Sequence, residues 1–280
     1  MKKPSIYYSN HYRNNPSFRE VYSYYMNAFT QYKKFMWVSF LTNFKASYRQ
    51  SFFGIIWKII LPLVPVVVYV VLQLLGLLRQ NSSMPSALYV VIGMTFWQLF
   101  ASSILTIMSS SIKDRAVLKK NKLPFILFYI SSLGETVFEY FIRLFLILVL
   151  LIYYNVDFSV SWLTLPLLCV PIILLGTGLG ILLSFFNVFF SDIRNFVDIL
   201  LRYGIFISGV IFPLSFGGTF TKILSWNPMY ILLDNFRDFL VFGHIVNTNH
   251  LLVTFALIFV LLFFSFKKLY SLEHVLREYL

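Results

Sequence analysis

The sequence predicts an all-α integral membrane protein with six transmembrane helices, an N-terminal amphipathic interfacial helix and short re-entrant gate helices between spans five and six. Hydrophobic residues make up 59% of the 280 residues and charged residues only 12%, whereas about 25% of residues are charged in a typical soluble domain. Long apolar runs recur along the chain, and the basic residues gather between these runs. Most of the chain is therefore expected to lie in or against lipid.

The apolar runs define the predicted spans. A helix needs about 20 apolar residues to cross about 30 Å of hydrocarbon. Six runs bounded by polar or turn-forming residues are candidates, at residues 55–78, 87–112, 130–154, 162–186, 196–213 and 250–268. The fifth differs from the others, because Asp198 and Arg202 lie in its first turns and Pro213 ends it.

The basic residues predict the orientation. If the N-terminus is cytoplasmic, the inside segments are 1–58, 113–122, 191–202 and 267–280, which hold nine, five, two and three Lys or Arg residues, 19 of the 23 in the chain. This asymmetry is the positive-inside signature, so both termini are predicted to be cytoplasmic. The net charge of +12 reflects these segments, and no nucleic-acid partner is expected. A cleaved signal peptide is not expected either, since the first 50 residues are polar and contain no short apolar core.

This topology divides the chain into a cytoplasmic N-terminus at residues 1–50, a single transmembrane domain at 51–270 and a cytoplasmic tail at 271–280. Within the first part, residues 29–44 mix lysines with aromatic and aliphatic side chains. Such a helix lies in the membrane interface, with its lysines near anionic headgroups. It is either an ordinary juxtamembrane anchor or a platform that touches a cytoplasmic partner. The candidate residues are Lys33, Lys34, Phe35 and Trp37.

A short basic loop joins spans two and three. It is either a plain positive-inside loop or, because its centre is apolar, a helix of one to two turns that docks in a cleft on a partner protein. The candidate docking residues are Lys113, Asp114, Arg115, Val117, Leu118, Lys119 and Lys120.

The third span carries a stripe of charges. Glu135, Glu139 and Arg143 are spaced four residues apart, so they lie along one side of a helix. Each charge in a membrane costs on the order of 2.5 to 3.5 kcal/mol on insertion scales, so such groups normally face protein or an aqueous path. The stripe is therefore either a Glu139–Arg143 pair that helps helices pack, or the border of a polar conduit or gate.

The segment between spans five and six alternates helix breakers with short apolar runs. Pro213 stops one helix, and Asn227 with Pro228 stops or starts another, on either side of runs too short to span that flank Trp226. Two short helices that dip into the membrane and return would satisfy this pattern. The rival interpretation is an amphipathic interfacial helix.

The sequence also lacks several motifs. It contains no GxxxxGK[ST] phosphate-binding loop, so the chain is not expected to bind and split ATP itself. Its four histidines are scattered and form no helical metal pair, and its one cysteine, Cys169, lies in an apolar run. No catalytic residue, resident cofactor or metal is therefore expected in this chain.

The order of these features resembles the permease subunits of ABC transporters that export polysaccharides, the family of O-antigen, capsule and teichoic-acid exporters. The similarity runs over nearly the whole chain. It departs from the family pattern at Ser191, where an arginine is expected. The matching motifs are Tyr48-Arg49-Gln50-Ser51 with Gly54, Trp57 and Leu61-Pro62-Leu63; Lys122-Leu123-Pro124; Asp192-Ile193-Arg194; and Asn227-Pro228 followed by Arg237.

The resemblance implies a homodimeric channel in the bacterial inner (plasma) membrane, with two copies of a cytoplasmic subunit that binds ATP and Mg. It implies that residues 29–44 form the interfacial helix, that the basic loop is the coupling helix, and that residues 214–242, including Arg237, form the gate. The cargo would be a lipid-linked glycan. Two alternatives stay open: an exporter of a smaller lipid or drug, and a membrane enzyme acting on lipid-linked sugars, for which Glu135 and Glu139 are the candidate acids.

Overall fold

The computed structural model describes residues 16–49, 84–120, 123–211 and 225–279, plus single residues from 60 to 75; for residues 47–49, 119 and 120 it describes the backbone alone. Every regular element in these ranges is a helix. In chain order they are α1 (Phe18–Arg49), α3 (Ser86–Lys113), α4 (Arg115–Lys120), α5 (Phe125–Tyr153), the 3-10 helix η1 (Val160–Thr164), α6 (Leu165–Phe189), α7 (Asp192–Ile207), α9 (Pro228–Phe242) and α10 (Thr248–Tyr279).

Four helices are long and apolar enough to cross a membrane: α3, α5, α6 together with η1, and α10, with 28, 29, 30 and 32 residues. At a rise of about 1.5 Å per residue each exceeds about 30 Å. They confirm the second, third, fourth and sixth predicted spans. The first predicted span, 55–78, falls almost entirely outside the described residues, as does Pro213.

The predicted fifth span corresponds in part to α7. This helix has 16 residues and begins at Asp192, four residues before the predicted start. Its 16 residues rise about 24 Å, less than the hydrocarbon thickness, and the predicted span runs on beyond residue 211, where the described part stops. Asp198 and Arg202, four residues apart on this helix, form an ion pair at its surface, with 2.9 Å between Arg202 Nη2 and Asp198 Oδ2. A count of six spans therefore stays a prediction.

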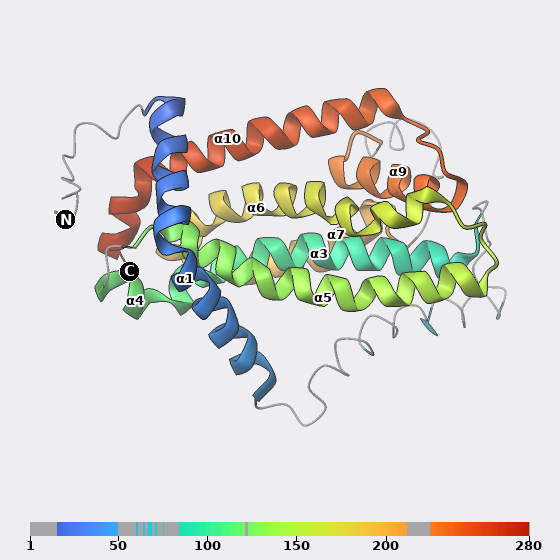
Figure 1. Ribbon diagram of the computed structural model, residues 1–280, viewed down its shortest axis with the longest axis horizontal. Coiled ribbons are helices and arrows are strands. Elements are labelled where there is room, and N and C mark those ends of the chain that lie inside the picture. The colour runs from blue at the N-terminus through green and yellow to red at the C-terminus, as the bar shows by residue number, and fades with distance from the viewer. Residues whose placement is uncertain are drawn as a thin grey trace.

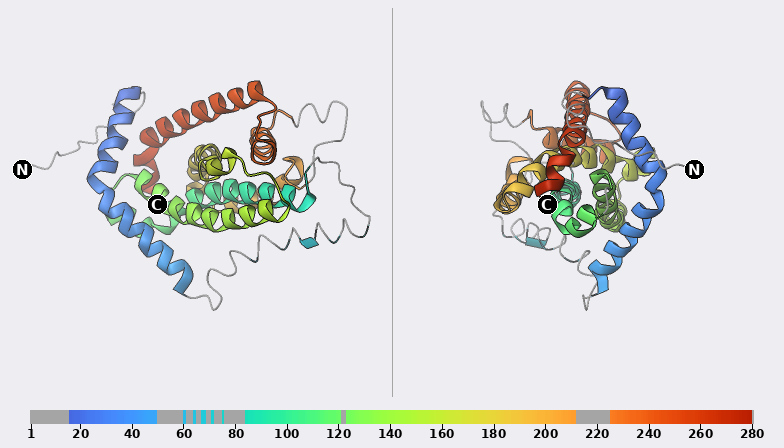
Figure 2. Two further views of the ribbon diagram at one scale, coloured as in Figure 1. Left: turned by 45° about the vertical axis from the view of Figure 1, so that its right-hand side comes forward. Right: turned by 90° about the vertical axis from the view of Figure 1, so that its left-hand side faces the viewer.

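The helix α3 forms the centre of the bundle. It packs against α5 and α6, α10 covers α6, and α1 runs across the bundle against α5 (Figures 1 and 2). Small residues let α3 and α6 approach closely: a Cβ on Gly176 would lie 2.8 Å from Ser103 Cβ, and one on Gly180 would lie 3.0 Å from Ile107 Cβ. Small residues spaced four apart are typical of such close helix contacts in membranes.

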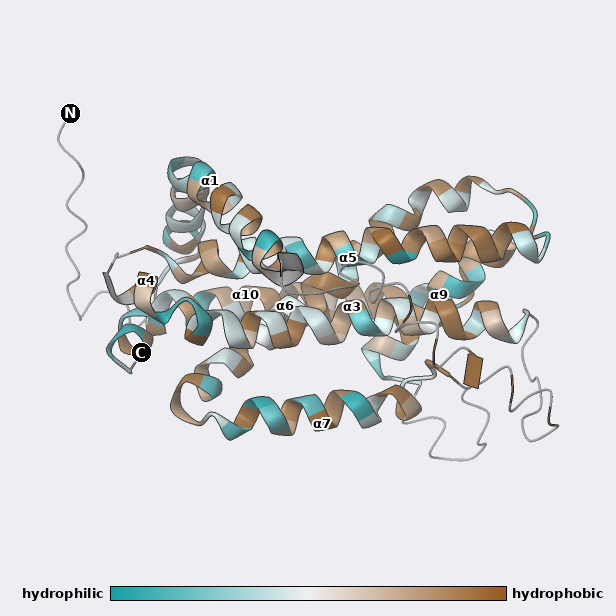
Figure 3. Cartoon of the chain, turned by 90° about the horizontal axis from the view of Figure 1, so that it is seen from below, coloured by the Kyte–Doolittle hydropathy of each residue, from teal (hydrophilic) through white to brown (hydrophobic). Residues whose placement is uncertain are grey.

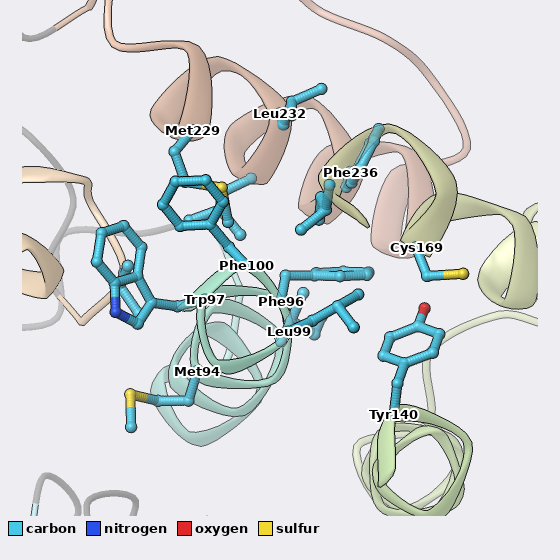
Figure 4. Close-up of a cluster of buried hydrophobic side chains, with 14 of the residues drawn as sticks. Met94, Phe96, Trp97, Leu99, Phe100, Tyr140, Cys169, Met229, Leu232 and Phe236 are labelled. Atoms are coloured by element: carbon cyan, nitrogen blue, oxygen red, sulfur yellow. The ribbon is translucent and has the colours of Figure 1, made fainter. Parts of the chain in front are cut away.

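Aromatic rings fill the core beside these contacts. Phe96 of α3 lies between Tyr140 of α5 and Phe236 of α9, with ring centroids 5.8 and 5.7 Å apart (Figure 4). The buried Tyr140 hydroxyl donates to the Leu165 carbonyl oxygen at 2.7 Å. This bond satisfies the one polar atom that the ring brings into the core, and it ties α5 to the start of α6.

The two ends of the bundle differ. The α1 and α4 helices and the last turns of α10 gather at one end, which we call the α4 end, whereas α9 lies toward the other, which we call the α9 end (Figure 1). A second hydrophobic cluster fills the α4 end and includes Tyr25, Leu118, Phe125 and Leu276. Hydrophilic residues are prominent in α4 and at the C-terminus, and hydrophobic residues along the spans (Figure 3). Three of the predicted inside segments thus meet at one end.

Candidate functional site

The predicted interfacial residues lie on α1, which crosses the α4 end of the bundle (Figure 2). The side chains of Lys33 and Lys34 are exposed, and Trp37 is 62% exposed. Phe35 points inward and packs edge to face on Phe128 of α5, with ring centroids 5.2 Å apart. The helix therefore has an anchored aromatic side and a basic outer side, the arrangement that suits a membrane interface.

The predicted docking loop forms a helix, as its apolar centre indicates. Lys113 ends α3, Asp114 makes the turn, and the Leu118 amide donates to the Asp114 carbonyl oxygen at 3.0 Å. Two adjacent apolar residues of α4 differ in their exposure. Leu118 is fully buried, whereas Val117 is 37% exposed and lies near the exposed Arg115. The Leu118 side chain therefore anchors α4 in the bundle, and the Val117 side chain faces solvent.

The turn before α4 holds a half-buried carboxyl group. Burial raises the pKa of Asp114, and the neighbouring positive charge of Lys113 opposes that rise. Among the described residues, nothing forms a hydrogen bond with its Oδ2 atom. Because burial penalises the carboxylate, a cationic group of a docked partner at this turn would offset that penalty.

The charged stripe of α5 lies in the middle of its span. Arg143 Nη2 donates to Glu139 Oε2 at 3.2 Å, and both side chains are about nine-tenths buried. Glu135, one turn earlier, is half-buried. The predicted pair is therefore formed, and it faces the protein interior as intramembrane charges generally do.

The start of α9 has the capping residues that the sequence indicates. The Asn227 Oδ1 atom accepts a hydrogen bond from the Met229 amide at 3.0 Å, and Pro228 occupies the first helical position. The Asn227 Nδ2 atom donates to Ser208 Oγ at 3.0 Å, just after α7. Trp226 is 62% exposed. The N-terminus of α9 is thus tied to the C-terminus of α7.

Arg237 makes a second tie between the same helices. Its guanidinium is fully buried and donates through Nη1 to the Gly209 carbonyl oxygen at 2.7 Å and through Nη2 to that of Val210 at 2.6 Å. It also lies 3.6 Å from the ring centre of Tyr89 on α3, whose hydroxyl donates to the same Gly209 carbonyl. A cation at the C-terminal end of a helix is favourable, so Arg237 fixes α9 to α7 and α3.

The predicted site residues thus occupy three levels of the bundle rather than one cluster. The interfacial and docking residues share the α4 end, the charged stripe lies at mid-span, and Asn227 and Arg237 converge on the end of α7.

Comparison with known proteins decides the family. Residues 34–241 match the ABC-2 type transporter family, which is well over half of the 280 residues. The chain belongs to the ABC-2 type transporter family. The resemblance to ABC permeases is confirmed at this level, and with four apolar helices of spanning length this ABC-2 transporter is a multi-pass membrane protein.

Three relatives of this ABC-2 transporter carry the same name, O-antigen export system permease protein RfbA. One from Klebsiella pneumoniae is 24% identical over 225 residues, which cover 78% of this chain and 84% of the relative. A second from Klebsiella pneumoniae is 25% identical, over 72% and 78% of the two chains. One from Myxococcus xanthus is 27% identical, over 69% and 75%.

Sequence reasoning about this ABC-2 transporter missed two residues at the α4 end, Glu273 and Arg277. The sequence held a signal, because a Glu followed four residues later by an Arg is a standard helix pair. Residues 271–280 were predicted as a cytoplasmic tail, with no structure assigned; those described, 271–279, continue α10, and Glu273 is only 1% exposed. The pair's partners are far away in sequence, which no local pattern reveals.

The two interpretations of the stripe in this ABC-2 transporter are separable by mutation. Arg143→Met leaves Glu139 as a buried charge without its Arg143 partner, so the free energy of unfolding is expected to fall by about 3 to 5 kcal/mol. The double variant Glu139→Leu/Arg143→Met removes both charges and is expected to recover most of that loss. Thermal unfolding of the purified variants measures both effects.

The double variant then decides the role of the stripe. If it is stable but does not transport, the stripe borders a conduit; if it transports normally, the pair serves packing alone. A double variant as unstable as Arg143→Met would contradict the expected recovery.

Proposed function

We propose that this chain is the transmembrane permease of an ATP-driven exporter that moves a lipid-linked polysaccharide of the O-antigen, capsule or teichoic-acid type across the inner (plasma) membrane. The observation that carries the proposal is the similarity, over 69% to 78% of the chain, to three proteins named as O-antigen export permeases. The family match over residues 34–241 agrees with it.

In this proposal two copies of a separate cytoplasmic subunit bind ATP and Mg and supply the energy. That subunit binds the exposed side of α4, which includes Arg115 and Val117. The buried Leu118 side chain holds α4 against the rest of the bundle. The exposed lysines of α1 lie at the same end. Both termini are then cytoplasmic, because the basic α4 end faces the ATP-binding subunits.

A second copy of the chain completes the channel in this proposal. Within α7, only Val197 is buried, so this helix packs little on its own bundle. Its exposed side is largely apolar, with Phe196, Leu200 and Tyr203 between 54% and 68% exposed. An apolar helix face of this kind suits a helix of a second copy or lipid.

The α9 end forms the outward gate in this proposal. Hydrogen bonds of Asn227 and Arg237 link α9 to the end of α7. A movement of α9 therefore either carries the end of α7 with it or breaks these hydrogen bonds. The lipid part of the cargo would remain in the membrane while the glycan passes between the two copies.

Reconstitution tests the proposal against its alternatives. The chain is purified together with a candidate ATP-binding subunit, placed in vesicles, and given a lipid-linked glycan. ATP-dependent transfer of the glycan across the bilayer is the expected result. Turnover of a lipid-linked sugar by the chain alone would identify an enzyme and overturn the transporter proposal. Deletion of the gene with full-length surface glycan still reaching the exterior would remove the polysaccharide as cargo and favour a smaller lipid or drug.

A further inference from the structure

The last turns of α10 contact the short helix α4. Arg277 Nη1 donates to the carbonyl oxygen of Leu118 in α4 at 3.0 Å, and its Nη2 donates to that of Leu123, just before α5, at 2.6 Å. The guanidinium carbon also lies 5.4 Å from the ring centre of Phe125. One side chain thus bonds to both sides of the connection between α4 and α5.

Glu273 extends this contact to a fourth helix, α1. Its carboxylate accepts from Arg277 Nη2 at 2.8 Å and from the Phe125 amide at 3.4 Å through Oε1, and from the Tyr24 hydroxyl of α1 at 2.9 Å through Oε2. Glu273 is 1% exposed. Burial of a carboxylate is tolerated where hydrogen bonds and an opposite charge compensate it, and here each of the three donors comes from a different element.

The helix α4 depends on such external support. It has six residues, too few to be stable alone, since isolated helices shorter than about 12 residues are marginal in water. The carbonyl groups of a last helical turn lack partners within the helix, and Arg277 supplies one for Leu118. The planar guanidinium is suited to this role, because it donates in several fixed directions at once.

We propose that Tyr24, Glu273 and Arg277 form a latch that holds α4 to α10 and α1, so that displacement of α4 passes to these two helices instead of being absorbed by the loops around it. The proposal rests on the proposed function, because an ATP-binding partner is what would displace α4. The three are positioning residues: the latch acts through α4 and touches no cargo.

The first test uses the chain alone, so it does not depend on any partner. Spin labels are placed at Val117→Cys on α4 and Lys268→Cys on α10, both exposed, with the buried Cys169 replaced by alanine. A narrow distribution of distances is expected in the parent protein and a broad one after Arg277→Gln. The matched control is Arg202→Gln, which breaks an exposed pair of the same spacing and is expected to leave the distribution narrow. An unchanged distribution after Arg277→Gln overturns the latch.

The second test measures transmission in the complete transporter. Arg277→Gln is expected to keep the complex assembled and ATP hydrolysis running, while the glycan exported per ATP falls about tenfold. Tyr24→Phe removes one hydroxyl and is expected to lower the same ratio about two- to threefold, the size of effect that one hydrogen bond gives. Because Tyr24→Phe is the milder change, it keeps the test decisive if Arg277→Gln does not fold.

The outcomes separate this proposal from the proposed function. A broadened distance distribution with an unchanged ratio of export to ATP overturns transmission by the latch. If no glycan export is found with any partner, the proposed function fails, and the distance measurement on the chain alone still decides whether the latch holds α4.

Discussion

Replacing Arg237 with glutamine is expected to detach the helix α9 from α7 and to abolish export. The guanidinium is buried and donates to the Gly209 and Val210 carbonyl oxygens. Without it Val210 loses this donor, and Gly209 keeps the hydroxyl of Tyr89. Leaving a buried polar group unsatisfied costs about 1 to 3 kcal/mol, and the emptied guanidinium site adds a cavity.

Thermal unfolding and transport measure this effect. The unfolding temperature of the purified Arg237→Gln protein is expected to fall by about 5 °C or more, since 1 kcal/mol shifts it by about 2 to 4 °C in chains of 150 to 250 residues. Arg237→Lys is expected to recover only part of the loss, because an ammonium lacks the planar fork that reaches two carbonyl groups. Arg202→Gln, which breaks an exposed ion pair of α7, serves as the control for the unfolding temperature.

The same site can be disturbed from the opposite side. A Cβ on Gly93 of α3 would overlap both the Arg237 guanidinium and the Val210 carbonyl oxygen. Gly93→Ala is therefore expected to lower stability and export in the same direction as Arg237→Gln, although it removes no hydrogen-bonding group. Normal export by both variants, at normal unfolding temperatures, would show that α9 is not held by this contact.

The second large effect is expected at α4, where two adjacent apolar residues should behave differently. Val117→Asp places a charge on the exposed side of the helix and is expected to abolish binding of the proposed ATP-binding subunit while the unfolding temperature stays unchanged. Leu118→Ala empties a fully buried position and is expected to lower the free energy of unfolding by about 2 to 5 kcal/mol.

Co-purification of the ATP-binding subunit, together with thermal unfolding of each variant alone, separates the two effects. Ala116→Ser, at an exposed neighbour on the same helix, is the matched control and is expected to bind normally. Normal co-purification of the Val117→Asp protein would refute α4 as the docking surface. An unfolding temperature unchanged by Leu118→Ala would refute its role as an anchor.

The sequence predicted those features of the fold that depend on neighbours along the chain. The runs at 87–112 and 162–186 predicted α3 and α6 nearly in full, because length and hydropathy alone decide whether a helix can cross lipid. For the basic loop the sequence left two alternatives, a plain loop or a short helix, and its apolar centre indicated the helix that the structure contains. The start of α9 was predicted from Asn227 and Pro228, because an asparagine cap and a proline at the first position act locally.

Other boundaries were less predictable. The helix α5 starts at Phe125, five residues before the predicted span, directly after Pro124. The helix α10 runs to Tyr279, well past residue 268. The residues that α5 adds, 125–129, are apolar and buried, so hydropathy alone could have included them. The residues that α10 adds mix polar and apolar side chains, and they remain helical because Glu273 and Leu276 are buried at the α4 end. A hydropathy pattern reports the part in lipid, not the turns that extend beyond it.

The sequence by itself therefore determined that this chain is a helical membrane protein and pointed to Arg237 and the Glu139–Arg143 pair, although not to Arg277. Only the tertiary structure decided what those charges do. Arg237 bonds to carbonyl groups 27 and 28 residues away, and Arg277 bonds to Leu118 at a separation of 159 residues. Hydrophobic runs and helix caps depend on residues that are close together in the sequence. A buried guanidinium instead donates hydrogen bonds to the carbonyl groups that the fold brings within about 3 Å, however distant they are in the sequence.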